Sequence, residues 1–292
     1  MGAGKRGRDI EGGDLPAGFL VAGSLGGMLK PKGKAVLPKT VWSNWVRIDA
    51  EQYRPYAQVC GFSAEQGVPL TWPYVLTFPL QMRLMMARDF PFAAMGTVHL
   101  SNHIRQEAQL FAGDELYVSC QAEALFSHPK GQVFSLLMKA ERDRMPVWSS
   151  RGFYLKRGEV GQGPPFSAAL ADLPLGKLDH KIETIEADLK TTRRYARHSG
   201  DVNPIHTSVL LARVLGFPRP IAHGMWAKAR ALSALTEGRP VDAAEAEVSF
   251  RNPLLLPAKA ELYAASSGTV YDFECRDSEP ARTHLRGRLS LL

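Results

Sequence analysis

One pattern of secondary structure occurs twice along this chain, and that repeat limits the fold more than any other feature. The two copies lie on either side of a Gly- and Pro-rich segment at residues 158–165, "GEVGQGPP", which has the composition of a linker. Each copy predicts a strand, a short helix, a longer apolar helix and then four more strands. This order is what a long helix wrapped by a curved antiparallel sheet would give, once per copy.

The second copy has the clearer strand signals. Its phrase "AEAEVSF" at 244–250 alternates apolar and polar residues, which is typical of a strand buried on one face. Gly238 is a candidate cap for the longer helix. The expected strands and helices of this copy lie at residues 180–187, 189–200, 223–238, 244–250, 258–264 and 285–291.

The first copy predicts a strand at 40–49, a short helix at 51–61, and strands from residue 96 to about 157. Its longer helix, at 74–90, is apolar and is expected to break near Pro79. The expected organisation is an N-terminal arm, weakly ordered or packed on the surface, then a first domain, a linker and a second domain. Their bounds are 1–37, 38–157, 158–175 and 176–292.

The copies align without a gap over 56–62 and 195–201, and again over 69–73 and 220–224. Between these blocks they differ in length. Phe62 and Pro69 are 7 positions apart, whereas Asp201 and Pro220 are 19 apart, so the second copy is 12 residues longer there. The added residues include "NPIH". A loop added to only one copy indicates that this copy carries the function.

Composition narrows the class of partner. The 292 residues are 45% hydrophobic and carry a formal net charge of +7, which suits an anionic partner such as a phosphorylated cofactor or an acidic carrier protein. Nucleic acid is not expected, because basic and acidic residues are interspersed and no nucleic-acid motif occurs. The three cysteines, Cys60, Cys120 and Cys275, form neither a disulfide framework nor a metal motif and indicate a reducing compartment.

The N-terminal region contains an apolar run at 15–29 that is too short to span a membrane. Acidic residues at 9, 11 and 14 interrupt what would be the basic part of a signal peptide. We therefore expect a cytoplasmic protein without stable membrane insertion.

The segment 195–225, "YARHSGDVNPIHTSVLLARVLGFPRPIAHGM", resembles the hydratase motif of the MaoC-like dehydratases and R-specific enoyl-CoA hydratases. The whole chain is similar to their two-domain form. The resemblance implies an α+β double hot-dog fold with a degenerate N-terminal half and an active C-terminal half. It also implies reversible hydration of 2-enoyl thioesters, with no metal and no redox cofactor. The acyl group would arrive on CoA or on an acyl carrier protein.

Hydration of a 2-enoyl thioester requires activated water, a proton for carbon 2 and donors for the thioester oxygen. Asp201 and His206 are the candidates for handling water and protons, with their individual roles left open. Gly224 can offer its backbone N–H at the start of the central helix. Three further candidates for substrate binding or loop shape are Asn203, Ser199 and His223. Low-ranked candidates for contacting the acyl group or CoA are Arg251 and Arg105.

The first copy lacks all three groups, since Phe62, Gly67 and Pro73 stand in the places of Asp201, His206 and Gly224. Its helix at 74–90 could line an acyl slot or simply belong to the core. His99 and His103 are expected to be structural.

Several alternatives stay open. A thioesterase can use the same fold and the same two residues. A protein that binds acyl thioesters without turnover is a second alternative. The oligomeric state is also open, and a homodimer of such chains is possible. A metal site built from His198, Asp201, His206 and His223 has the right ligand types but no standard zinc spacing.

Overall fold

The computed structural model describes residues 8–9, 34–167, 178–278 and 282–292. Most of the expected N-terminal arm and the end of the expected linker lie outside these residues. The elements of the first half are β1 (Arg8–Asp9), β2 (Val41–Arg47), α2 (Ala50–Cys60), α3 (Trp72–Met86), β3 (Thr97–Gln106), β4 (Glu115–His128), β5 (Gly131–Arg142) and β6 (Met145–Arg157).

The second half repeats this succession with two short helices added. Its elements are β7 (His180–Ala187), α4 (Leu189–Ser199), α5 (Pro204–Thr207), α6 (Val209–Val214), α7 (Gly224–Leu235), β8 (Ala244–Phe250), β9 (Ala258–Ser267), β10 (Val270–Arg276) and β11 (Thr283–Leu291). The helices α5 and α6 are formed by the residues that the second copy has gained.

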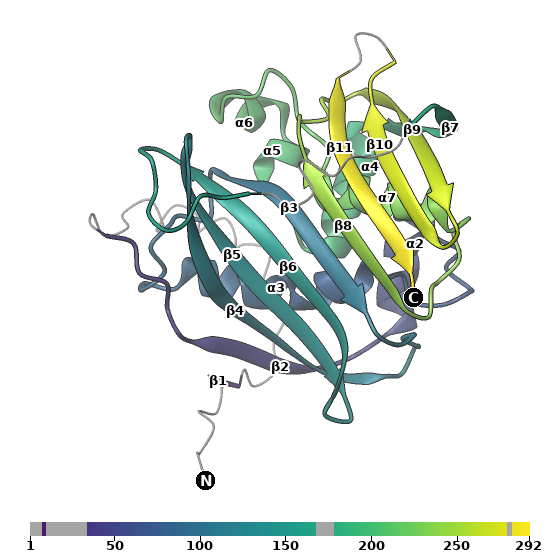
Figure 1. The fold of residues 1–292 in the computed structure, drawn as a ribbon, viewed down its shortest axis with the longest axis horizontal. Coiled ribbons are helices and arrows are strands. Elements are labelled where there is room, and N and C mark those ends of the chain that lie inside the picture. The colour runs from purple at the N-terminus through teal and green to yellow at the C-terminus, as the bar shows by residue number, and fades with distance from the viewer. Residues whose placement is uncertain (1–7, 10–33, 168–177, 279–281) are drawn as a thin grey trace.

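All strands among the described residues join one sheet in the order β1-β2-β4-β5-β6-β3-β8-β11-β10-β9-β7. The first half contributes β2-β4-β5-β6-β3 and the second contributes β7-β9-β10-β11-β8, so equivalent strands occupy equivalent places. The halves meet where β3 pairs antiparallel with β8, with Asn102 opposite Val248. Figure 1 shows the curved sheet with the helices packed against it. The expected α+β double hot-dog fold is confirmed.

The two short helices end in the same way because each is followed by a glycine. Gly61 after α2 has φ +81° and Gly200 after α4 has φ +75°. Side chains other than glycine rarely adopt this left-handed backbone. At the other end of each helix an aspartate accepts a backbone hydrogen bond: Asp49 from Glu51 and Asp188 from Thr191. The repeat seen in the sequence is therefore also a repeat of local geometry.

The longer helix of the first half corrects one expectation. It runs without a break from Trp72 to Met86 and passes through Pro79, where a break was expected. A proline inside a helix removes one backbone hydrogen bond. Burial compensates for that loss here, since nine of the 15 residues of α3 are buried.

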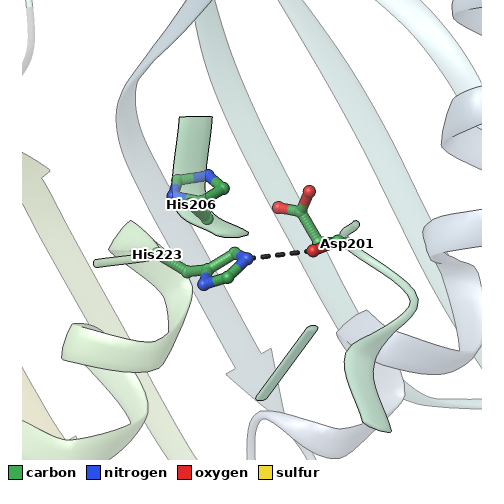
Figure 2. A group of neighbouring side chains, drawn as sticks. All are labelled: Asp201, His206 and His223. Atoms are coloured by element: carbon green, nitrogen blue, oxygen red, sulfur yellow. Dashed lines mark hydrogen bonds between the residues drawn. The ribbon is translucent and has the colours of Figure 1, made fainter. Parts of the chain in front are cut away.

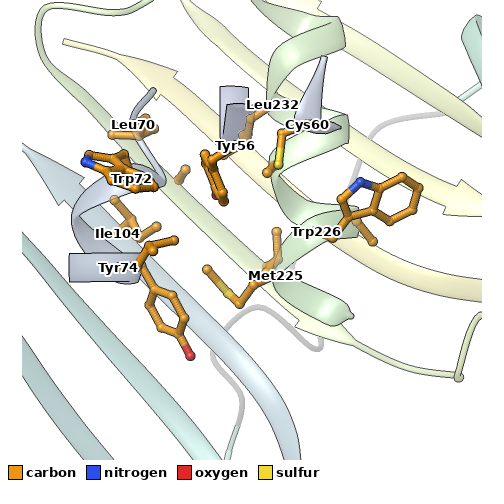
Figure 3. Close-up of a cluster of buried hydrophobic side chains, with 14 of the residues drawn as sticks. Tyr56, Cys60, Leu70, Trp72, Tyr74, Ile104, Met225, Trp226 and Leu232 are labelled. Atoms are coloured by element: carbon orange, nitrogen blue, oxygen red, sulfur yellow. The ribbon is translucent and has the colours of Figure 1, made fainter. Parts of the chain in front are cut away.

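The two halves share one apolar core. Tyr56 and Tyr195, which align in the two copies, face each other with ring centroids 5.7 Å apart. The indole N–H of Trp226 on α7 donates to the backbone oxygen of Val59 in the first half (2.9 Å). Figure 3 shows Trp226 and its neighbour Met225 in the same cluster as side chains from α2, α3 and β3. Because sheet and core are both shared, the expected domain bounds stay a prediction.

The first part of the linker packs against the first half. The backbone N–H of Phe166 donates to Ser127 on β4 (2.8 Å), and the Phe166 ring contacts Phe126 and Phe153. All three cysteines are free and buried. Among the described residues, no helix has the length and apolar character needed to cross a membrane.

Candidate active site

The loop after α4 is folded by hydrogen bonds between its own side chains and backbone. Ser199 Oγ accepts from the Asp201 N–H, and Asp201 Oδ1 accepts from the Asn203 N–H, each at 3.3 Å. Asn203 Oδ1 in turn accepts from the Ile205 N–H at the start of α5 (3.3 Å). Short polar side chains of this kind favour tight turns and helix starts. The sequence "SGDVNPIH" thus holds the Asp201 carboxyl at a defined place.

His206 lies on α5 and is 7% exposed. Its Nδ1 is 2.8 Å from the backbone oxygen of Ile221. A carbonyl oxygen only accepts hydrogen bonds, so Nδ1 carries the proton and Nε2 of the neutral ring keeps its lone pair. Burial lowers the pKa of His206, although the charge of Asp201 and the bond to Ile221 act in the opposite direction. The neutral ring with an available Nε2 is the form of a general base.

His223 anchors the loop from the start of α7. Its Nε2 is 2.9 Å from the backbone oxygen of Asp201, to which it donates. Its ring stacks on His206 with centroids 3.7 Å apart and planes 26° apart. Burial lowers the pKa of His223 well below its usual range, and the neighbouring His206 lowers it further. His223 therefore fixes the positions of both Asp201 and His206 as a neutral ring.

Asp201, His206 and His223 form one group, shown in Figure 2, in which one carboxylate oxygen and one ring nitrogen from each histidine lie within 4.8 Å of one another. Two hydrogen bonds of about 2.8 Å each, through one water, can span such a separation. His198 is not part of this group. It lies in the last turn of α4, and its pKa is lowered first by burial and then by Arg197 and Arg194.

Asp201, His206 and His223 bring three candidate metal ligands close together, and the placement of the two imidazoles bears on whether they could share an ion. A metal ion lies in the plane of the imidazole that binds it, at about 2.0–2.1 Å from the nitrogen for zinc. The ring planes of His206 and His223 are nearly parallel and stacked at 3.7 Å. The two rings are thus stacked rather than turned edge-on toward a common point.

Gly224 is the first residue of α7, so its backbone N–H lies at the positive end of that helix. The aromatic ring of Phe250 on β8 packs closely over it. A Cβ at position 224 would lie 3.1 Å from Phe250 Cε1, tighter than an ordinary contact. A side chain here would thus crowd the ring of Phe250.

The two arginines singled out from the sequence lie in different surroundings. Arg105 on β3 is engaged by two carboxylates: its Nε donates to Glu107 (2.6 Å) and its Nη1 to Glu245 (3.4 Å). It points to the same side of the strand as His103, whose Nε2 lies 2.5 Å from Glu245. Arg251 is exposed and directly follows Phe250. Of the two, only Arg251 adjoins a residue that contacts Gly224.

The equivalent place in the first half holds no comparable group. Phe62 is 7% exposed and belongs to the core, and Pro73 lies in the first turn of α3. Three residues with polar side chains nevertheless lie close enough for the charge of Asp201 to act on them: Tyr74, His99 and Tyr154. Sequence reasoning did not single out the two tyrosines and took His99 as structural. The aromatic and polar residues at 74, 99 and 154 have no spacing along the chain that indicates a site.

Comparison with known proteins agrees with this architecture. The MaoC-like domain matches residues 175–279. The chain is 35% identical over 260 residues to 3-hydroxyacyl-thioester dehydratase X of Mycobacterium tuberculosis (strain ATCC 25618 / H37Rv), covering 87% of this chain and 90% of the relative. This chain belongs to the MaoC-like dehydratase family, whose members are hydro-lyases.

Solved structures show the same fold. The crystal structure of HtdX from Mycobacterium tuberculosis superposes with a TM-score of 0.73 at 33% identity, over 86% of this chain and all of the other. A MaoC-like dehydratase from Phytophthora capsici has a TM-score of 0.71 at 18% identity, over 88% of this chain and 96% of the other. The second likeness speaks for the fold alone.

Proposed function

We propose that this protein catalyses the reversible hydration of trans-2-enoyl thioesters to (R)-3-hydroxyacyl thioesters. The observation that carries the proposal is the placement of Asp201 within 4.8 Å of a buried His206 whose Nδ1 is held by Ile221. The name of the M. tuberculosis relative, a 3-hydroxyacyl-thioester dehydratase, supports the same reaction read in the opposite direction.

In the hydration direction, one water is held between His206 Nε2 and the Asp201 carboxylate. Nε2 takes a proton from this water as its oxygen bonds to carbon 3, and the electron pair of the double bond moves toward the thioester oxygen. The imidazolium returns the proton to carbon 2, so one molecule of water is added. Asp201 stabilises the transient imidazolium, as its charge already raises the pKa of His206. Because His206 alone handles the protons at carbon 3 and at carbon 2, the hydroxyl group and the proton should add to the same face of the double bond.

The Gly224 N–H is proposed to stabilise the developing negative charge on the thioester oxygen. It lies at the positive end of α7, where backbone N–H groups have no partner within the helix. The ring of Phe250 packs against Gly224 at this position. In this mechanism, His223, Ser199 and Asn203 position the loop.

The reaction is proposed to need no metal ion and no cofactor beyond the carrier of the acyl group. The stacked arrangement of His206 and His223 supports this part of the proposal. Dialysis against a chelator should leave turnover unchanged. Loss of activity that returns with added Zn²⁺ would contradict it.

Incubation with crotonyl-CoA and longer 2-enoyl-CoAs, followed at the enoyl absorbance, tests the reaction. Loss of the enoyl absorbance with the thioester intact, and an (R)-3-hydroxyacyl product on a chiral column, is the expected result. Release of free CoA without hydration would identify a thioesterase instead. Binding without turnover at every chain length would identify an acyl-thioester-binding protein.

The substrate also depends on which carrier holds the acyl group, CoA or an acyl carrier protein. A net charge of +7 suits both the CoA phosphates and an acidic acyl carrier protein. We propose CoA, because exposed Arg251 directly follows the Phe250 that packs on Gly224. Comparing turnover of one acyl group on CoA and on carrier protein, with and without Arg251→Ala, tests this. A selective rise in KM for CoA is expected in the variant.

A further inference from the structure

An irregularity in β3 turns one histidine of the first half toward the interior. Along regular β3, residues such as Ile104 face the core and His103 and Arg105 face outward. The register against β6 shifts between His99 and Ser101, so His99 pairs with Tyr154. Bulges of this kind re-aim side chains and are frequent beside active sites. His99 consequently faces the inner side of the sheet with Tyr154.

His99 connects the first half with the start of α7 through aromatic contacts. Its ring stacks on Tyr154 with centroids 4.4 Å apart and contacts Phe250 at 4.9 Å. Phe250 is the residue that packs against Gly224. The side chains of the first half therefore reach, through one intervening ring, the place proposed for the thioester oxygen.

A directed chain of hydrogen bonds lies beside His99. The Tyr154 hydroxyl donates to Gln81 Oε1 (3.2 Å), and it lies 3.2 Å from the Tyr74 hydroxyl. Since Tyr154 uses its one proton toward Gln81, Tyr74 must be the donor in the second contact. Figure 3 shows the Tyr74 hydroxyl pointing away from the apolar cluster. We call Tyr74, Gln81, His99 and Tyr154 the polar wall.

Two atoms of the polar wall have no hydrogen-bond partner among the described residues: His99 Nε2 and Gln81 Nε2. Gln81 is 1% exposed. Buried polar atoms are almost always hydrogen-bonded, so such a pair calls for an explanation. Burial, followed by the charge of Lys228, lowers the pKa of His99 to about 3, and a backbone hydrogen bond to Ser101 opposes this shift. The neutral ring donates to Ser101 and offers Nε2 as an acceptor, while Gln81 Nε2 is a donor.

The polar wall lies within electrostatic range of the Asp201 carboxylate. Burial raises the pKa of both Tyr74 and Tyr154, and the negative charge of Asp201 raises both further. In the proposed mechanism, the thioester oxygen and carbon 3 are served by residues of the second half. The part of the substrate left to meet the polar wall is the acyl chain beyond carbon 3.

We propose that the polar wall binds a hydroxyl group carried on the acyl chain, beyond the reacting carbons. A hydroxyl donates one hydrogen bond and accepts others, which matches an acceptor at His99 and a donor at Gln81. This inference rests on the proposed function for where the acyl chain lies. It makes the inert half a specificity element for hydroxylated acyl thioesters.

The test compares trans-2-octenoyl-CoA with the same thioester hydroxylated singly at carbons 5 to 8. The quantity measured is the ratio of kcat/KM for each hydroxylated substrate to that for the plain one. We expect at least one isomer to be preferred by about tenfold, the upper range for one net neutral hydrogen bond. His99→Phe keeps a ring but removes the acceptor, and Gln81→Leu removes the donor. Each should lower that ratio by about fivefold or more.

His103→Phe is the matched control, because it makes the same substitution on the outer face of the same strand and should leave the ratio unchanged. If His99→Phe does not fold, Gln81→Leu and the wild-type ratios decide. No preferred isomer in the wild type, or a preference that survives both variants, overturns the inference. If the wild type does not hydrate plain trans-2-octenoyl-CoA, that result would instead contradict the proposed function.

Discussion

The same helix end occurs in both halves of the molecule and leads to opposite outcomes. After α2, Gly61 is followed by Phe62, which is buried in the core; after α4, Gly200 is followed by Asp201, which faces two histidines. The next residue of the first half, Ser63, donates its backbone N–H to Gly238 of the second (2.8 Å). In the first half this loop serves the contact between halves, and in the second it serves the candidate site.

The starts of the longer helices differ in the same sense. The second half presents the N–H of Gly224, whereas the first half has Pro73 in the equivalent turn, and proline has no N–H to present. The first half keeps the fold, supplies the larger share of the common core and adds polar side chains on α3, β3 and β6. A duplicated fold can thus divide packing and chemistry between its copies.

Removing the first half is the largest disturbance to this division. A fragment of residues 166–292 keeps Asp201, His206 and Gly224 but loses the partner strand of β8 and the contacts of Trp226. Exposed strand edges and apolar surface favour association. We expect an insoluble or self-associated fragment, assessed by size-exclusion chromatography with light scattering. If it self-associates in a folded form, activity on longer chains should be lost first, because α3 is missing. A monomeric fragment with full activity on all chain lengths would contradict the division.

The proposed catalytic pair gives the next largest effect. Asp201→Asn and His206→Ala should each lower kcat by about 10²–10⁴-fold, the usual contribution of general acid–base catalysis. The double variant should fall only slightly below the poorer single variant, because both side chains act on one water. Steady-state kinetics on crotonyl-CoA measures this, with circular dichroism to verify folding. Near-normal turnover in either single variant would remove that residue from the mechanism.

Acid pH should lower activity through protonation of His206. Its pKa is lowered from the ordinary value of about 6.5, so the neutral base persists through neutral pH. Below the lowered pKa, kcat/KM should fall about tenfold per pH unit. Acid pH should also lower stability. In the unfolded chain, histidine binds a proton below about pH 6.5. In the folded protein, the lowered pKa values of His99, His206 and His223 keep these rings neutral at that pH, so the free energy of unfolding falls as the pH drops below about 6.5. Initial rates at pH values where circular dichroism shows a folded protein separate the two. An acid limb absent over the whole pH range in which the protein stays folded would argue against His206 as the base.

A buried lysine offers a smaller test of how the halves are joined. Lys228 on α7 is 0% exposed, and its Nζ donates to Asn102 Oδ1 (2.7 Å), Asn102 O (3.2 Å) and Ala246 O (2.9 Å). Lys228→Met leaves these acceptors buried without their donor. We expect the free energy of unfolding in urea to fall by about 2–4 kcal/mol. Lys259→Met, on an exposed part of β9, should change it by less than about 0.5 kcal/mol. Equal stability of both variants would show that Lys228 does not hold the junction.

Most of the fold was predictable because its signals are local. Alternation such as that of 244–250 marks strands, and glycines 61 and 200 mark helix ends, so both halves appeared at nearly their observed bounds. The break expected at Pro79 was wrong because burial of α3, which is a tertiary effect, outweighs the lost hydrogen bond. The contiguous loop holding Asp201 and His206 was singled out for the same reason as the strands: it is local.

What the sequence did not indicate depends on contacts between distant residues. The ring of His223 stacks on His206 and donates a hydrogen bond to Asp201. These contacts form only because the chain, after passing through α6, brings the start of α7 back to the loop that follows α4. His99 joins Tyr154 through a register shift, and strand periodicity alone would have turned it outward. Tyr74 and Gln81 lie seven positions apart on an apolar helix, a spacing that equally fits ordinary core packing.

The smallest expected effect is the most direct probe of the difference between the halves. Pro73→Gly restores a backbone N–H at the start of α3, yet Phe62 and Gly67 still stand where the acid and imidazole would be. Combined with Asp201→Asn, it should therefore recover no hydration of crotonyl-CoA above the Asp201→Asn level. Exchanging proline for glycine in a helical first turn should cost about 1 kcal/mol of stability through the greater freedom of the unfolded chain. Thermal unfolding verifies that the variant remains folded. Renewed turnover in the double variant would mean that a helix-start N–H alone makes a working site.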